Sequence, residues 1–485
     1  MREELRFGPW LPDVTDHKNP GLEGCTNVLP GPGGYIPFQG AGTEVATVSA
    51  TVLSARGFER SDGTRVTCCA TAGDLHAIVG GTVTNAGLAL ALTDPVQFAR
   101  YGSAVYATNK SGTWYIANIE SGTTFIAAGW TIPDGLALGR IGDFLFMGNL
   151  TDTDASDKPY RIRWSPFNNP AGTWAADIGN QSGAVDMPQD LGPVMAISGG
   201  SVGLIFQKRG ISRISYVGGS VVFAKETVDT LRGCIAPFSV VEVGETRYFL
   251  SDDGFFATEG TSARSISRGK VWKWFQENSS EFYIGDVQGA VNWPDRCVLW
   301  TVLGSTGMPV GLIAYNWETE WWSAIDITLD CILASGKDGL TLEQFSALYP
   351  DIDTAPLSMD DPAFAARGRI LSGFFSGSLK PFTGATLAAQ FETGEFQPSP
   401  GRRTFVRGVT PLITDAGTGT TASLLGRERQ NLTYSSQNNV AMSAIGLAPF
   451  NLDARYYRVR LSCPAGANWR DAYGFEVDFD VSGET

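Results

Sequence analysis

The stretch RYFLSDDGFFATEGTSARSISRGKVWKWF, residues 247–275, holds one complete β-hairpin followed by an aromatic segment. Asp252, Asp253 and Gly254 separate an apolar strand, YFLS, from a returning strand, FFATE. This triplet has turn chemistry, because a glycine can adopt a positive φ at low cost. The stretch therefore predicts a hairpin with its turn at Asp252, Asp253 and Gly254.

The same order of strand, glycine-ended turn and strand recurs along the chain. It is found in LHAI-VGG-TVTN (75–85), VYAT-NKSG-TWYIA (105–117) and LIFQ-KRG-ISRIS (204–215). Comparable units begin at Phe144, Val298 and Leu371. Propeller blades recur every roughly 40–50 residues, and the longer intervals here contain insertions. We therefore expect an all-β protein with a β-propeller of six to eight blades. A stack of sandwiches or a β-helix fits this repeat less well.

Segments rich in proline and glycine divide the chain into three parts. Residues 1–42 are dense in proline, which predicts an extended N-terminal arm packing on the propeller. We expect residues 43–397 to form the propeller, with a short helical insertion near 340–350. We expect residues 398–485 to form a C-terminal β-sandwich. We expect the arm, through Tyr35 and Phe38, to pair with the last blade and close the ring.

Composition narrows the classes of function. The net charge of −14 and the pI near 4.7 argue against tight binding of nucleic acid, which needs clustered basic residues, but not against the passage of DNA. Seven scattered cysteines without metal spacing predict reduced, mostly buried thiols and assembly in a cytoplasm. No stretch has the length of a membrane-spanning helix or of a signal peptide, so we expect no membrane span.

No complete catalytic or metal-binding motif is present. The chain has two histidines, His17 in the arm and His76 in a hairpin strand, and neither has a nucleophile motif beside it. The segment DTDASD (152–157) resembles the start of a calcium loop, but Asp157 stands where the loop needs glycine. The pair Asp252 and Asp253 has the residue type of glycosidase carboxylates, although adjacent turn residues are usually only turn formers. We predict no enzyme, cofactor or metal.

Two groups of residues are candidates for contact with other chains. Trp321 and Trp322 are consecutive, so in a strand their rings point to opposite faces and one would face solvent or a partner. Arg402, Arg403 and Arg407 form a basic cluster that could bind an acidic neighbouring subunit or DNA phosphates.

Several longer segments, in their order along the chain, resemble the tail nozzle or tail hub proteins of short-tailed bacteriophages, also described as phage stabilisation or head-tail joining proteins. The resemblance spans nearly the whole chain. It rests on LPDVTDHKNPGLEGCTNVLPGPGGYIPFQG (11–40), KRGISRISYVGG (208–219), GCIAPFSVVEVGETRYFLSDDGFFATEG (233–260), IAYNWETEWWS (313–323), FETGEFQPSPGRRTFVRGVTPLI (391–413) and ARYYRVRLSCPAGANW (454–469).

The resemblance implies a structural protein of the virion tail. Its propeller would carry accessory β domains, and six copies would form a ring around the DNA channel, below the portal and adaptor and in contact with tail fibre or needle proteins. The alternative is a propeller glycosidase or carbohydrate-binding protein acting on host polysaccharide. A glycosidase would need two carboxylates about 5–9 Å apart in one pocket.

Overall fold

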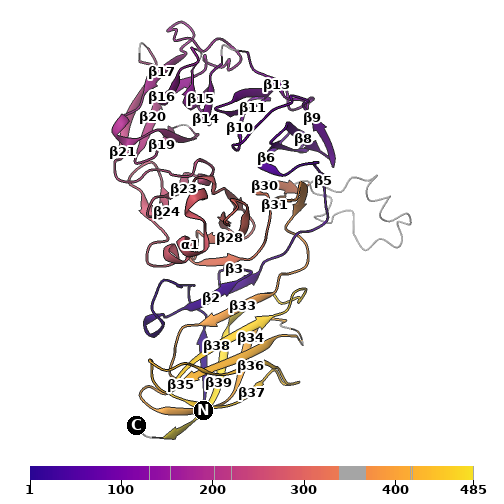
Figure 1. Cartoon of the computed structure of the whole chain (residues 1–485), viewed down its shortest axis with the longest axis vertical. Helices are drawn as coiled ribbons and strands as arrows, with labels where there is room; N and C mark the ends of the chain where they lie inside the picture. The colour runs from indigo at the N-terminus through magenta and orange to yellow at the C-terminus, as the bar shows by residue number, and fades with distance from the viewer. Residues whose placement is uncertain are drawn as a thin grey trace, which may run out of the picture.

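The computed structural model describes residues 1–485 except 130–131, 153, 201, 220, 338–367, 416, 418 and 484–485. A ring of small antiparallel sheets forms one end of the molecule and a sandwich of two larger sheets forms the other (Figure 1). Both chain termini lie at the sandwich end, and the N-terminal segment, in indigo, runs up between sandwich and ring (Figure 1).

The ring consists of seven four-stranded blades, so the protein is a β-propeller, as the repeats predict. Strand order within each blade follows chain order, except that the last blade takes its fourth strand from the N-terminal side of the chain. The first three blades are β6 (Val52–Glu59), β7 (Arg65–Thr71), β8 (Leu75–Val79) and β9 (Thr82–Asn85); β10 (Gln97–Tyr101), β11 (Ala104–Asn109), β12 (Gly112–Ile116) and β13 (Ile126–Ala127); and β14 (Asp134–Ile141), β15 (Phe144–Thr151), β16 (Asp157–Trp164) and β17 (Gly183–Asp186).

The remaining four blades have the same antiparallel order. They are β18 (Val194–Ser198), β19 (Val202–Gln207), β20 (Ile211–Tyr216) and β21 (Phe223–Asp229); β22 (Val241–Val243), β23 (Thr246–Ser251), β24 (Gly254–Thr258) and β25 (Arg264–Ser265); β26 (Gly289–Asn292), β27 (Cys297–Leu303), β28 (Pro309–Asn316) and β29 (Trp322–Ile325); and β30 (Cys331–Lys337), β31 (Gly368–Phe375), β32 (Ser378–Pro381) and β5 (Ala46–Thr47).

The hairpin predicted from the sequence forms the middle of the fifth blade. Ser251 pairs with Gly254, so Asp252 and Asp253 are the two residues of the turn. Gly254 has a φ of +143°, and a Cβ at this position would lie 2.6 Å from Oγ of Ser267. The turn therefore needs glycine both for its backbone angle and for space.

The ring is closed by β5 rather than by the residues predicted for that role. Ala46 pairs with Leu379 of β32, and the Val45 N–H donates to the Leu379 carbonyl at 2.9 Å. Tyr35 instead pairs with Ala472 of the sandwich. A closing strand of two residues carries little sequence signal, which is why the stronger apolar pattern around Tyr35 misled the prediction.

The sandwich takes its strands from both ends of the chain, which corrects the predicted boundaries at 42 and 398. Cys25 pairs with Phe391, so the arm and a strand before residue 398 both belong to a sandwich sheet. One sheet contains β3 (Val28–Gly31), β4 (Gly34–Pro37), β39 (Ala472–Gly483), β34 (Arg403–Ile413) and β37 (Ala448–Ala454), with β1 (Arg2–Arg6) paired to β39. The other contains β2 (Leu22–Thr26), β33 (Ala389–Thr393), β38 (Tyr456–Cys463), β35 (Thr421–Arg427) and β36 (Ser435–Ala441).

The arm joins the two modules. Thr26 of β2 pairs in parallel with Ala324 of β29, so the sixth blade and one sandwich sheet form a continuous nine-stranded sheet. Tyr35 packs its ring 5.6 Å from Trp321 of the propeller and 5.8 Å from Phe391 of the sandwich. The arm thus packs on the propeller, as predicted, but it also builds the sandwich, and the two modules share one apolar core.

Helix is scarce, and the predicted helical insertion near 340–350 lies outside the described residues. The structure has one short α-helix, α1 (Trp272–Asn278), in the part of the chain it describes. Asp13 of the arm caps this helix, because its carboxylate accepts the backbone N–H groups of Lys273 (2.8 Å) and Trp274 (2.9 Å). None of the helices in the described residues has the length and apolar character needed to cross a membrane.

Candidate functional site

A cavity with a volume of about 480 Å³ occupies the central channel of the propeller. Its wall is formed mainly by the first strand of each blade, and all seven blades contribute to it. Five charged side chains line it, namely Arg56, Glu59, Arg65, Glu242 and Arg369. A cavity of this volume lies within the range of small-molecule sites and is far too narrow for a DNA duplex.

The charged residues of the channel lie toward the C-terminal ends of the inner strands. Glu59 ends β6 and pairs in register with Arg65, whose Nη1 lies 2.7 Å from Glu59 Oε2. Arg369 stands opposite Gly336, the next-to-last residue of β30. Trp293 follows the last residue of β26, and the Arg369 guanidinium lies 5.0 Å from the centroid of its ring. These groups therefore gather toward one mouth of the channel.

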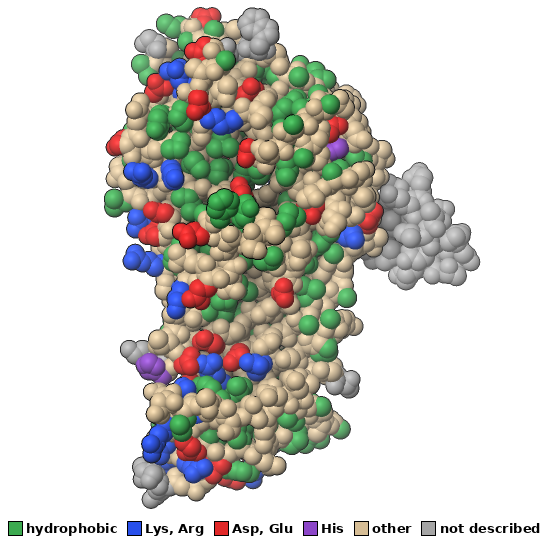
Figure 2. All heavy atoms as spheres, in the orientation of Figure 1, with side chains coloured by type: hydrophobic (Ala, Val, Ile, Leu, Met, Phe, Trp, Pro, Cys, Tyr) green, Lys and Arg blue, Asp and Glu red, His purple; other side chains and the backbone are tan. Residues whose placement is uncertain are grey.

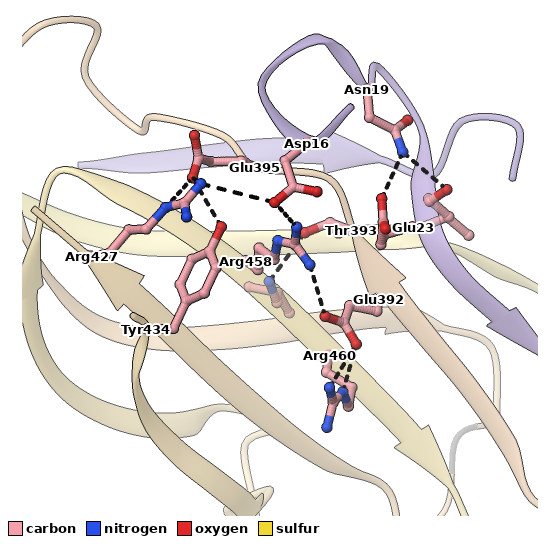
Figure 3. Close-up of polar contacts among 12 residues, drawn as sticks. Asp16, Asn19, Glu23, Glu392, Thr393, Glu395, Arg427, Tyr434, Arg458 and Arg460 are labelled. Carbon is pink, nitrogen blue, oxygen red and sulfur yellow. Dashed lines mark hydrogen bonds and ion pairs between the residues drawn. The ribbon is translucent and has the colours of Figure 1, made fainter. Parts of the chain in front are cut away.

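A second polar centre lies where the arm crosses the sandwich (Figure 3). Three arginines from β35 and β38 meet carboxylates from the arm and from around β33 on one face of the sheet. Asp16 of the arm is ion-paired with Arg458, which also contacts Glu392 at 3.3 Å. Arg460 lies 2.7 Å from the same Glu392 carboxylate. The contacts tie the arm to strands that lie more than four hundred residues later in the chain.

The most buried ion pair of this centre is Arg427 with Glu395. Arg427 Nε donates to Glu395 Oε2 at 2.6 Å, and the Glu395 side chain is 2% exposed. The Tyr434 hydroxyl donates to the same oxygen at 2.9 Å, while its ring packs 4.4 Å from the Arg427 guanidinium. Nearby, burial raises the pKa of Glu23 above its ordinary value. These contacts link the arm to the sandwich strands and give the centre a structural role as a joint.

The sequence analysis predicted neither centre, although its quoted segments contain Asp16, Glu392 and Arg458 of the joint. In the segment YYRVRL (456–461), alternation places Arg458 and Arg460 on one face of a strand, which is a readable signal for an ionic face. The identity of the opposing carboxylates is not readable, because Asp16 and Glu392 come from distant parts of the chain. Trp293 and Arg369 are likewise brought together only by the closed ring.

The predicted turn residues Asp252 and Asp253 make contacts that stabilise the turn. Asp253 is ion-paired with Arg232 at 3.0 Å, and Asp252 accepts a hydrogen bond from the Ser251 hydroxyl at 3.1 Å. Neither Asp252 nor Asp253 lines the central channel. With Gly254, the pair forms the turn and not a catalytic pocket.

The predicted tryptophan pair is used inside the chain. Trp322 is fully buried and stacks on Trp300 with ring centroids 6.0 Å apart, so it is not available to another chain. Trp321 is half-buried and packs on Tyr35. Trp321 therefore keeps part of its surface exposed beside the arm, and its contact with another chain stays a prediction.

Two arginines of the predicted basic cluster, Arg403 and Arg407, are paired with acidic residues of the sandwich. Arg403 is ion-paired with Glu428 at 3.0 Å and Asp453 at 3.2 Å, while Arg407 lies 3.2 Å from Asp478. Arg402 is exposed. On the face drawn in Figure 2, lysines and arginines are interspersed with acidic side chains rather than gathered in one broad patch.

Two of the remaining sequence candidates, His76 and Asp152, have polar partners within the propeller. His76 is buried, with Nδ1 2.8 Å from Asn85 Oδ1 and Nε2 3.0 Å from Thr71 Oγ1. His17 is exposed. Asp152, the first residue of the calcium-like segment, is ion-paired with Arg163 at 2.9 Å. No group of three metal-ligating side chains is found among the described residues. All seven cysteines are buried and unpaired, as predicted.

Strand order and channel together define a seven-bladed β-propeller joined to a β-sandwich. No protein-family model matches the chain, and neither does any curated protein sequence. Among solved structures, it is similar to the WD40 domain of Pan2 from Neurospora crassa, with 7% identity over 70% of this chain and 95% of that chain and a TM-score of 0.38.

A catalytically inactive virginiamycin B lyase from Staphylococcus aureus, solved with quinupristin, is similar at 10% identity, covering 70% of this chain and 97% of that chain, with a TM-score of 0.38. The extracellular domain of the putative hybrid two-component system BT4673 from B. thetaiotaomicron is similar at 8% identity. The match covers 86% of this chain and 48% of that chain, again with a TM-score of 0.38. At this low identity and TM-score, the functions of these proteins cannot be transferred to this chain.

Proposed function

We propose that this protein is a structural subunit of a bacteriophage tail, a nozzle or hub protein of the short-tailed type. Six copies form a ring whose lumen retains the DNA and conducts it during ejection. Its partners are neighbouring copies, the adaptor and portal side of the tail, and fibre or needle proteins. The subunit assembles in the host cytoplasm and resides in the virion.

One observation carries the proposal: the segments that resemble nozzle proteins are the segments that build the scaffold. Residues 11–40 form the joint between propeller and sandwich, and 233–260 contain the central hairpin of the fifth blade. Residues 313–323 and 391–413 supply strands on either side of the joint. A sequence resemblance that follows the strands of the scaffold favours a structural role over an enzymatic one.

The charge of the protein is compatible with a lumen through which DNA slides. A net charge of −14 gives a wall that repels phosphates weakly, whereas a basic wall would hold them. The lumen in this proposal lies between subunits, since the channel within one propeller is too narrow for a duplex.

Electron microscopy and analytical ultracentrifugation of the purified protein test the proposal. We expect six-fold rings, either of the protein alone or after addition of the portal and adaptor proteins from the same phage. A protein that stays monomeric at all concentrations and fails to join a portal-adaptor complex would overturn the proposal. Hydrolysis of a capsular glycan, abolished by a single carboxylate substitution, would instead support the glycosidase alternative.

A further inference from the structure

The channel lining has a charge opposite in sign to the chain as a whole. Its five charged residues comprise three arginines and two glutamates, a formal charge of 3 − 2 = +1, in a protein of net charge −14. Both glutamates already have partners. Glu59 pairs with Arg65, and Glu242 accepts hydrogen bonds from the Ser198 hydroxyl (2.7 Å) and the Gly199 N–H (3.1 Å).

Arg369 is held by aromatic rings and not by an acid. Its guanidinium lies 5.0 Å from the Trp293 centroid, and Trp293 is supported by Trp317 in an edge-on contact at 6.1 Å. A guanidinium packed on an aromatic ring keeps the N–H donors on its edge for a further partner. The aromatic support therefore fixes the arginine in place while leaving it able to bind an oxyanion in a bidentate manner.

Arg56 is held in a similar manner on the first blade. Its Nη1 donates to the Phe98 carbonyl at 2.8 Å, and the guanidinium lies 6.0 Å from the Phe58 centroid. Among the described residues, no carboxylate is ion-paired with Arg56 or Arg369. Two guanidinium groups, each oriented by neutral neighbours, thus line one cavity.

The other end of the channel is less suited to an anion. Gln288 Nε2 reaches from the start of β26 to the Leu53 carbonyl of the first blade at 2.8 Å, which links two blades there. Asp94 and Asp286 precede the inner strands of the second and sixth blades, and burial together with the nearby Asp94 charge raises the pKa of Asp286. An anion entering the channel would therefore meet its favourable partners at the arginine mouth.

We propose that the mouth of the propeller channel is a binding site for a small organic oxyanion, a molecule carrying carboxylate or phosphate groups. Arg56 and Arg369 bind its charged groups, and Trp293 orients Arg369. The cavity of about 480 Å³ accommodates a ligand of the size of a sugar acid or sugar phosphate. This site lies inside one subunit and does not depend on the proposed ring.

Isothermal titration calorimetry of the full chain at low salt tests the proposal with three probes: inorganic phosphate, glucuronate and glucose 6-phosphate. We expect saturable binding of at least one organic probe, and comparison of the probes distinguishes carboxylate from phosphate as the preferred group. Removing a charge-assisted contact, as in Arg369→Ala or Arg56→Ala, should weaken binding about 10- to 100-fold. Arg369→Lys, which keeps the charge but loses the planar fork, should give an intermediate loss.

Arg402→Ala is the matched control, because it removes an exposed arginine from the sandwich, away from the channel, and should leave binding unchanged. Should an alanine variant prove unstable on heating, Arg56→Gln and Arg369→Gln keep more of the side-chain volume and replace it in the titration. The proposal is overturned if none of the probes binds at millimolar concentration, or if binding persists undiminished in folded variants of both arginines.

Discussion

At the scale of single residues, the fold depends on a few positions where the backbone angle, the space or the hydrogen bonds allow only one residue type. Gly254 provides both a φ of +143° and the space beside Ser267, whose hydroxyl accepts the Phe255 N–H at 2.8 Å. Asp13 caps a helix that lies some 260 residues away in the chain. Such positions tolerate little change, because no neighbouring residue can provide the same backbone conformation or the same hydrogen bonds.

Gly254→Val should destabilise the protein by about 1–3 kcal/mol, because a β-branched residue is strained at this φ and would displace Ser267. Chemical denaturation monitored by tryptophan fluorescence measures the free energy of unfolding. Gly73→Val is the control, since Gly73 is exposed and a Cβ there meets nothing within 4 Å. Equal stability of the two variants would show that the turn does not need glycine.

Arg427→Ala should cost about 3–5 kcal/mol, because it leaves the Glu395 carboxylate buried without its ion partner. The exposed pair of Arg403 and Glu428 provides the comparison, since both side chains are more than a third exposed. Arg403→Ala should therefore cost less than about 1 kcal/mol. If the two substitutions have equal effects in the same denaturation experiment, burial does not strengthen the joint.

At the scale of elements, the sequence predicts pairing between strands that are close in the chain. It does not predict pairing between strands that are far apart in the chain. The hairpins of the propeller follow from local alternation and glycine-ended turns, so the blades and the turn at Gly254 could be predicted. The joint could not, because Cys25 and Phe391 lie far apart in the chain and are neighbours only in the folded molecule. The same holds for the channel site, where Arg369 meets Trp293 across two blades.

The closing strand β5 offers an element-scale test. Val45→Pro should destabilise the ring by about 1–3 kcal/mol, because proline removes the N–H that donates to the Leu379 carbonyl at 2.9 Å. Val45 is 42% exposed, so Val45→Ala keeps the hydrogen bond and should change the stability by less than about 0.5 kcal/mol. Differential scanning calorimetry compares the two. A proline variant that melts like the alanine variant would show that this contact does not hold the ring closed.

At the scale of the whole molecule, the propeller and the sandwich share a sheet and an apolar core and are not joined by a linker alone. The nine-stranded sheet runs from the sixth blade through β2 into the sandwich, and a single apolar core includes Trp322, Tyr35 and Phe475. The proline-rich sequence of residues 1–42 predicts an arm that only packs on the surface of the propeller. Here it supplies strands to both sandwich sheets, so the mechanical connection between the modules depends on the first forty residues.

Deletion of residues 1–42 tests this connection, since it removes β1 to β4 but keeps the closing strand β5. Hydrogen exchange measured by mass spectrometry should show loss of protection in β33 and β39, which pair with the arm, and in β29, which pairs with β2. Strands β11 and β15, whose sheets contain no arm residue, should keep their protection, because local stability follows local pairing. If β39 stays as protected as in the full chain, the sandwich is stable without the arm, and the two modules fold independently.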